Sequence, residues 1–167
     1  DGPLFDKGRL LYNLDKAGPA ARKSGRLVVV EGYMDVIGVA NAGIAELVAP
    51  LGTAMTEAQL QLAWRVVDEP ILCFDGDGAG QRAALRAAMR ALPLLAPGKS
   101  LRIATLPQGE DPDDMVRRAG AAAFEAVLAG AVPLIDQLWA AETEGLASAT
   151  PERRAAARAR LRAHADS

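Results

Sequence analysis

The chain has 167 residues, of which half are hydrophobic, and a net charge of −2. This length suits one domain with a substantial core, the composition excludes an intrinsically disordered protein, and the charge by itself favours no polyanionic partner. The single cysteine, Cys73, and the single histidine, His164, exclude a disulfide framework and a zinc site built from these residue types. No signal peptide and no apolar run long enough to cross a membrane are visible, so we expect a cytoplasmic protein without a membrane partner. The first residues, Asp-Gly-Pro without a methionine, suggest a piece of a longer protein.

Short apolar runs alternate with segments of helical spacing over the first two-thirds of the chain. Residues 1–25 are predicted to form a lead-in, with a helix over 10–17 and a turn over 23–25. Strands are predicted over 27–30, 46–50, 70–74 and 101–107, with helices between them over 34–43, 56–67 and 80–95. This alternation predicts an α/β fold: a parallel sheet of about four strands with helices on both faces. After residue 111 the pattern is helical, over 111–120, 122–130, 133–145 and 151–165.

Some side chains in these elements are predicted to be structural. Thr56 or Thr53 is expected to cap the helix over 56–67. Trp64 and Trp139 could stack on nucleic-acid bases, but their helical spacing among apolar residues favours the core. Cys73, within an apolar run, is predicted to be a packed core thiol.

The helix over 80–95 has an apolar and a basic stripe. Leu85, Met89 and Leu92 share one face, which is therefore predicted to be buried. The basic stripe consists of Arg82, Arg86 and Arg90. It could follow a nucleic-acid backbone, although arginines on an exposed helix face are more often simply solvated.

Acidic residues follow three of the four predicted strands. In an open parallel sheet, ligands bind outside the carboxyl ends of the strands, so these acids are expected to converge. They are Glu31 after the first strand, Asp75 and Asp77 after the third, and Asp111 and Asp113 after the fourth. Carboxylates that converge without histidine or cysteine repel one another unless a hard cation neutralises them, and such a donor set suits Mg²⁺ or Mn²⁺. The glycines between these acids, Gly76, Gly78 and Gly80, are expected to let the backbone bend and approach a ligand closely.

Simpler interpretations of the same acids remain open. Asp111 and Asp113, taken alone, are more typical of a helix N-terminus than of a metal site. An EF-hand is excluded because Ala79 and Arg86 occupy ligand positions of that loop. A dinucleotide-binding loop is excluded because its last glycine is missing and the acids would repel a pyrophosphate.

Four segments together resemble the Toprim domain of bacterial DnaG-type primases. They are EGYMDVIGVANAGI (31–44), PLGTAMTEAQ (50–59), ILCFDGDGAGQRAALRA (71–87) and LPQGEDPDDMVRRAG (106–120). The resemblance extends from about Leu4 to about Leu134, and the order and spacing of the segments are highly specific. It implies a lead-in over 1–25, a Toprim domain over 26–118 and the start of a helical subdomain over 119–167.

The resemblance also implies a function, the synthesis of short RNA primers on single-stranded DNA with divalent metal and no zinc in this part. Glu31, Asp75 and Asp77 would be the catalytic, metal-binding acids. Supporting roles would fall to Asp35, Asp111 and Asp113 as further acids, to Lys7 and Lys16 near the incoming nucleotide, and to Arg82 and Arg86 near the DNA. The family often has basic residues where Gly78 and Gln81 stand in this chain. The implied partners are a single-stranded DNA template, ribonucleoside triphosphates, an RNA–DNA hybrid and, through a domain outside this chain, a replicative helicase at the bacterial nucleoid. Alone, the chain is expected to be inactive or weakly active.

Three other functions are considered. A haloacid-dehalogenase-type phosphatase would use Asp75 as nucleophile, but it expects Thr or Val at Ala79 and leaves the EGYMD segment unexplained. A non-catalytic Toprim-like module would bind metal and scaffold partners. A topoisomerase is disfavoured because Tyr12 and Tyr33 lie in the resemblance as ordinary motif residues.

Overall fold

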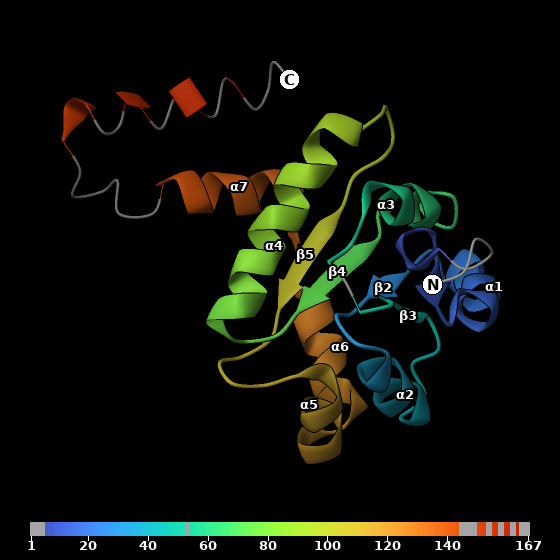
Figure 1. The fold of residues 1–167 in the computed structure, drawn as a ribbon. Helices are drawn as coiled ribbons and strands as arrows, with labels where there is room; N and C mark the ends of the chain where they lie inside the picture. Colours follow the sequence, from blue (N-terminus) through green and yellow to red (C-terminus); the bar gives the residue numbers. More distant parts are fainter. Residues whose placement is uncertain are drawn as a thin grey trace.

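The computed structural model describes residues 6–52, 54–143, 150–152, 155–156, 159–160 and 163. Within this part of the chain, strands pair in the order β1-β3-β2-β4-β5-β6 (Figure 1). The strands are β1 (Leu11–Tyr12), β2 (Val28–Val29), β3 (Leu47–Pro50), β4 (Ile71–Phe74), β5 (Arg102–Thr105) and β6 (Val132–Pro133). The four inner strands, β2 to β5, are parallel to one another and confirm the predicted sheet.

Two short antiparallel strands, β1 and β6, extend the sheet at its edges. The helix predicted over 10–17 is therefore wrong in its first half, since Leu11 pairs with Pro50 and the helix begins only at Leu14. Asn13 separates the two elements because its left-handed backbone (φ 68°) fits neither a strand nor a helix. The purely helical C-terminal pattern is interrupted by β6, where Pro133 is tolerated because an edge strand needs no donor on its outer side.

Seven α-helices and two 3₁₀ turns are bounded within the described residues. The helices are α1 (Leu14–Ser24), α2 (Tyr33–Asn41), α3 (Glu57–Trp64), α4 (Gly78–Ala91), α5 (Pro112–Ala119), α6 (Ala121–Ala129) and α7 (Leu134–Thr143). The 3₁₀ turns are η1 (Lys7–Arg9) and η2 (Leu92–Leu94). Of the two threonines predicted as caps of this helix, Thr56 caps α3, because its hydroxyl accepts the Gln59 N–H at 3.2 Å. Thr53 lies outside the described residues.

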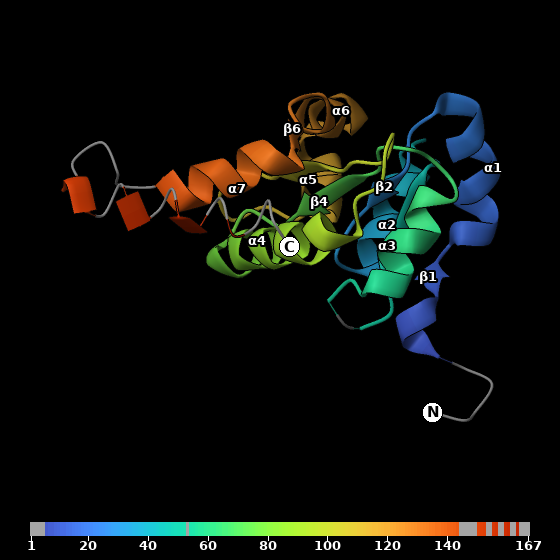
Figure 2. The same cartoon turned by 90° about the horizontal axis from the view of Figure 1, so that it is seen from above.

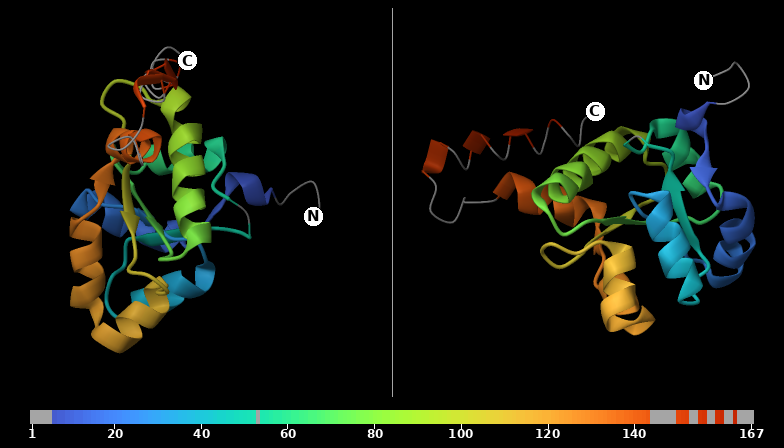
Figure 3. Two further views of the ribbon diagram at one scale, coloured as in Figure 1. Left: turned by 90° about the vertical axis from the view of Figure 1, so that its left-hand side faces the viewer. Right: turned by 60° about the horizontal axis from the view of Figure 1, so that its bottom comes forward.

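Helices cover both faces of the sheet, as predicted. Residues that alternate along β2 and β4 enter two separate cores: Val29 and Leu72 pack with α1, α3, α4 and α7, whereas Val28 and Ile71 pack with α2, α5 and α6. Figure 2 shows α4 and α6 on opposite sides of β4 and β5. On the second face, α2 packs against α5 (Figure 3). None of the described helices is both long and apolar enough to cross a membrane.

The buried face of α4 differs from the predicted one. Its buried residues are Gly80, Ala84, Ala87, Ala88 and Ala91. Of the predicted leucine and methionine stripe, Leu85 and Leu92 are half-buried, and Met89 is 45% exposed. A face of alanines and glycine lets the helix approach the sheet closely, so the larger side chains lie at its margins.

The two tryptophans have different environments. Trp64 is buried, as predicted, and its indole N–H donates to the Ser100 carbonyl at 2.7 Å. Trp139 is 58% exposed, so its predicted core position is wrong: α7 buries Leu134 and Leu138, and Trp139 lies on another face of that helix. Cys73 is buried as predicted.

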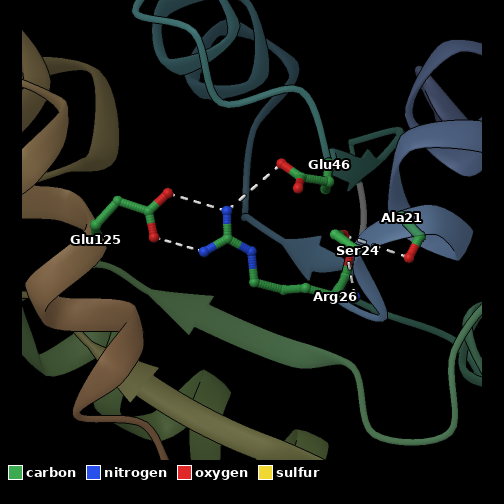
Figure 4. A network of polar contacts seen from close by, with 5 residues as sticks. All are labelled: Ala21, Ser24, Arg26, Glu46 and Glu125. Carbon is green, nitrogen blue, oxygen red and sulfur yellow. Dashed lines mark hydrogen bonds and ion pairs between the residues drawn. The ribbon is translucent and has the colours of Figure 1, made fainter.

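The core continues past residue 118, since Phe124, Leu128 and Leu134 are buried. A charged network joins α6 to the segments that precede β2 and β3, at the amino ends of the parallel strands (Figure 4). The Arg26 guanidinium donates to both carboxylate oxygens of Glu125, at 2.5 and 2.9 Å, and to Glu46 at 3.4 Å. The hydrogen bond to Glu125 and the charges of both glutamates raise the pKa of Arg26 against the opposing effect of burial. A bidentate pair of this kind fixes the orientation of α6 on the sheet.

Candidate active site

The candidate site lies where the topology of the parallel sheet reverses. From β2 the chain passes to β3 on one side, and it then returns to form β4 and β5 on the other side. A crevice therefore opens outside the carboxyl ends of β2 and β4, which is the usual ligand position in such sheets. Glu31 follows β2 and Asp75 follows β4, and the Asp75 backbone N–H donates to Glu31 Oε1 at 3.1 Å. The structure thus brings together the two acids that the sequence placed on separate strands.

Asp75 is the most strongly perturbed acid of the group. Burial raises the pKa of its carboxyl to about 7, and the charges of Glu31, Asp35, Asp111 and Asp77 add to this rise. Its Oδ1 atom is buried and has no hydrogen-bond partner among the described residues. A buried carboxylate oxygen without a donor is costly, so this atom is available for a cation.

Asp77 begins α4 and is exposed. Its carboxylate accepts the Gly80 N–H at 2.6 Å, which caps the helix. This local hydrogen bond fixes one oxygen and leaves the side chain beside Asp75, whose pKa it helps to raise. Asp77 is therefore both a helix cap and a member of the acidic group.

The bend between Asp75 and Asp77 requires glycine. A Cβ atom at Gly76 would lie 1.7 Å from the Pro107 carbonyl oxygen, and one at Gly80 would lie 2.1 Å from the Asp75 carbonyl oxygen. The Gly76 N–H donates to Glu110 O at 3.0 Å, and Gly109 N–H donates to Gly76 O at 2.9 Å. The loops after β4 and β5 are thereby joined through their backbones. Gly76 and Gly80 therefore lie close to other backbone atoms of the chain, whereas at Gly78 a Cβ would meet only the end of the Arg82 side chain, at 3.2 Å. The predicted close approach of this loop to a ligand stays a prediction.

The acids after β5 have mainly local contacts. Asp111 caps α5 by accepting the Asp114 N–H at 2.7 Å, and its charge also raises the pKa values of Asp75 and Asp35. Asp113 forms a short ion pair with Arg117 and lies against Gly38 of α2, where a Cβ would be 1.9 Å from its Oδ1. The charge of Asp111 thus acts on both Asp75 and Asp35, whereas Asp113 is directed toward α2 and its charge acts on Asp35 alone of the two.

Asp35 connects α2 to this group. Its Oδ2 accepts the Gly32 N–H at 3.2 Å at the start of α2. Burial raises the pKa of Asp35 to about 6, and the charge of Asp111 adds to this, while backbone N–H groups of Gly32 and Asp113 oppose it. Asp35 therefore supports the site from the helix beside Glu31.

The acidic group suits a hard divalent cation by its chemistry. It offers only oxygen donors, and the charges of its members raise the pKa values of Asp75 and Asp35. Asp75 also has a buried oxygen without a partner among the described residues. Within the described residues, however, no three acidic, histidine or cysteine side chains are already arranged around one point as a formed metal site. A bound ion would thus have to draw these side chains together.

The predicted basic residues lie on separate elements. Lys7 lies in η1 and Lys16 is exposed on α1, both on the β1–β3 side of the sheet. Arg82 and Arg86 are exposed on α4. Arg90, the third residue of the stripe, is instead half-buried and donates to the Met55 carbonyl, so only part of the predicted basic stripe is free for a ligand.

A cavity of about 340 Å³, which the sequence did not predict, adjoins Glu31 and Arg86. Its other walls include Val29, Leu72 and Phe74 from the sheet and Ala83 and Ala87 from α4. No spacing in the sequence indicates it, because it forms between a helix and strands that are distant along the chain.

Glu110 is an acid near the site that the sequence analysis did not single out. Its Oε2 is buried without a partner among the described residues, while Oε1 pairs closely with Arg118. Only its place in the GEDPDD segment, in the loop that joins β5 to α5, could have indicated it.

Comparison with known proteins identifies the class of this domain, since residues 25–104 match the family model of the Toprim domain. The DNA primase of Neisseria meningitidis serogroup A is 44% identical over 93% of this chain, and the match covers 26% of that protein. A DNA primase domain from Pseudomonas aeruginosa has a similar structure, with a TM-score of 0.92 at 40% identity over 99% of this chain and 52% of the other. A DnaG primase catalytic domain bound to single-stranded DNA gives a TM-score of 0.88 at 41% identity, over 98% and 54% of the two chains.

The chain therefore contains a Toprim domain, and over nearly its full length it is similar to the Toprim part of DnaG primase catalytic cores. It spans about a quarter of the length of the curated relatives that it matches. This assignment replaces the haloacid-dehalogenase alternative, in which Asp75 was the nucleophile.

Proposed function

We propose that this chain is the catalytic part of a DNA primase that synthesises short RNA primers on single-stranded DNA by nucleotidyl transfer. The observation that carries this proposal is the position of Glu31 and Asp75 at the reversal point of the sheet, joined by a hydrogen bond of 3.1 Å. Similarity to a DnaG catalytic domain bound to single-stranded DNA supports the choice of template. The remainder of the catalytic core and the contact with a replicative helicase would come from parts outside this chain.

Asp75 and Asp77 are the proposed shared ligands of Mg²⁺ or Mn²⁺, with Glu31 opposite them and Asp111 and Asp113 in support. Two such ions, when bound, activate a 3′-hydroxyl and neutralise charge on a leaving pyrophosphate. Glu31 accepts the Asp75 N–H, so its carboxylate is held toward the loop after β4 and could also accept the hydroxyl proton. Asp35 supports the group from α2.

The basic residues would bind the anionic substrates. Lys7 and Lys16 are proposed to contact the triphosphate of an incoming ribonucleotide, and Arg82 and Arg86 the DNA strand or the RNA–DNA hybrid. Residues 26–118 are proposed as the Toprim unit, residues 1–25 as its link to the preceding part of the core, and residues 119–167 as the start of a helical subdomain.

Primer synthesis tests this proposal in a chimera in which the chain replaces the matching segment of the Neisseria meningitidis primase. Glu31→Gln removes the charge and the capacity to take a proton but keeps the shape of the side chain. Synthesis is expected to fall by about a hundredfold or more, in line with general-base contributions of 10²–10⁴. Asp136→Asn, an exposed acid of α7, is the matched control.

A melting curve of each variant separates catalysis from folding. Near-normal synthesis by Glu31→Gln contradicts the catalytic role, and lost synthesis with a collapsed melting temperature assigns Glu31 to the fold. An active unmodified chimera also excludes the non-catalytic Toprim-like module, which the sequence had left open.

A further inference from the structure

A buried amide, Gln59, binds the turn that carries Lys7. Gln59 is fully buried, and within the described part of the chain no other polar or charged residue is buried. Its Nε2 group donates to the carbonyl oxygens of Lys7 at 3.0 Å and Leu10 at 2.7 Å. Its Oε1 atom accepts the Thr56 N–H at 2.9 Å. One side chain thus joins the start of α3 to both ends of the turn, across about fifty residues of sequence.

Thr56 adds a third bond to the same turn. Its hydroxyl donates to the Gly8 carbonyl at 2.5 Å and accepts the Gln59 N–H at 3.2 Å. The carbonyls of Lys7, Gly8 and Leu10 are therefore all bound by two side chains from the first turn of α3.

Contacts within the turn itself run to Asp6, at its start. Gly8 N–H donates to Asp6 Oδ1 at 2.9 Å, Arg9 N–H donates to Asp6 O at 3.1 Å, and the exposed Arg9 side chain pairs with Asp6 Oδ2 at 3.3 Å. A 3₁₀ turn of three residues is a weak local structure, so its position depends on the contacts from α3. A buried amide is retained only where its donors and acceptor are satisfied, and here each hydrogen of Nε2 has a carbonyl partner.

We infer that Gln59 is a positioning residue for nucleotide binding, which it supports by fixing the backbone from which the Lys7 side chain extends. This inference rests on the proposed contact between Lys7 and the triphosphate of the incoming nucleotide. None of the acids whose charges raise the pKa of Asp75 belongs to η1 or α3. Gln59 is therefore expected to govern the affinity for the nucleotide and to leave the metal-binding acids unaffected.

The structural part of the inference is tested on the chain itself by amide hydrogen exchange. Gln59→Met keeps the length and the burial of the side chain but removes both donors. Gln61→Met, an exposed glutamine two residues further along α3, is the matched control. Exchange at Gly8 and Arg9 is expected to become about tenfold faster in Gln59→Met, with exchange in β4 and Mn²⁺ affinity unchanged.

A second variant separates the turn from the helix cap. Gln59→Glu keeps an acceptor for the Thr56 N–H, and so keeps the capping box of α3, but replaces the donors to Lys7 O and Leu10 O. The turn is expected to loosen in this variant as well. Unchanged exchange at Gly8 and Arg9 in both variants, or a collapsed melting transition in both, overturns the inference.

The functional part is tested by steady-state primer synthesis in the chimera. Gln59→Met is expected to raise the KM for ribonucleoside triphosphates about three- to tenfold with kcat nearly unchanged, as for a loss of uniform binding. Lys7→Ala is measured alongside it. If Lys7→Ala leaves KM unchanged, the proposed contact of Lys7 fails. If Lys7→Ala raises KM and Gln59→Met does not, the positioning role of Gln59 fails by itself.

Discussion

Asp75 has a buried oxygen without a hydrogen-bond partner in the described part of the chain, and four acids lie near it. Removing its charge should weaken divalent-ion binding, because an amide is a poorer ligand than a carboxylate for a hard cation. We expect Asp75→Asn to bind Mn²⁺ at least about tenfold more weakly in calorimetry, the effect of losing roughly 1.4 kcal/mol of binding free energy. Asp136→Asn should bind as the unmodified chain does. Equal affinity in both variants would remove the basis of the metal site.

The same carboxyl predicts a pH dependence of stability in the absence of metal. Its pKa rises from an ordinary value of 3.8 to about 7 in the folded chain, so the folded state holds the proton more tightly than the unfolded state. The free energy of unfolding that this group contributes is therefore largest below its unfolded pKa and is lost as the pH rises toward about 7. Asp35, with a pKa raised to about 6, acts in the same direction.

Denaturation in EDTA at about pH 5 and about pH 8 measures this effect. Asp75→Asn should lose less stability than the unmodified chain between these conditions, by roughly 1–2 kcal/mol after allowance for solvent screening. Parallel losses in the two proteins would contradict the raised pKa.

Among the elements, the loop between β4 and α4 has little freedom to move, because backbone hydrogen bonds join it to the loop after β5. A methyl group at Gly76 would collide with the Pro107 carbonyl, so Gly76→Ala must push the two acid-bearing loops apart. We expect it to lower the free energy of unfolding by about 1–3 kcal/mol, as overpacking does, and to weaken Mn²⁺ binding.

Gly78→Ala is the matched control for this loop. Its Cβ would meet only a flexible arginine end, and alanine favours the first turn of a helix, so stability should change by less than about 0.5 kcal/mol or rise slightly. Urea denaturation with the two variants in parallel tests the difference. Equal stability would show that the loops do not need to lie so close together.

As a whole molecule the chain carries a net charge of −2, and a group of five of its acids surrounds the carboxyl ends of β2 and β4 (Glu31, Asp35, Asp75, Asp77 and Asp111). Arg82 and Arg86 on α4 supply few phosphate contacts. Binding of this chain alone to single-stranded DNA should therefore be weak and should fall steeply with salt, with a slope of about 0.7 per phosphate contact on a logarithmic scale.

Fluorescence anisotropy over a salt series measures this binding. Replacing Arg82 and Arg86 together by alanine should flatten the slope, whereas replacing Arg22, which is exposed on α1, should not. Nanomolar affinity at physiological salt would show that the DNA follows a different surface.

The sequence by itself determined the parallel sheet and the acids at its edge. Buried strands appear as short apolar runs, and an acid that directly follows such a run must lie at the carboxyl end of a strand, whatever the rest of the fold does. The positions of Glu31, Asp75 and Asp77 follow from local order alone. The glycines around Asp77 likewise indicated a sharp bend of the backbone after β4.

Only the tertiary structure decided which surfaces meet. The alanine face of α4 is buried instead of the leucine stripe, Trp139 lies on an outer face, and β1 and β6 exist because β3 and β5 offer them an edge. The direction of Asp113 toward Gly38 and the bonds from Gln59 to the Lys7 turn likewise join segments that are distant in sequence. Periodicity records the average polarity of a helix face or a strand, whereas these contacts depend on the distance between elements. That distance is set by packing and by non-local hydrogen bonds, which leave no regular pattern along the chain.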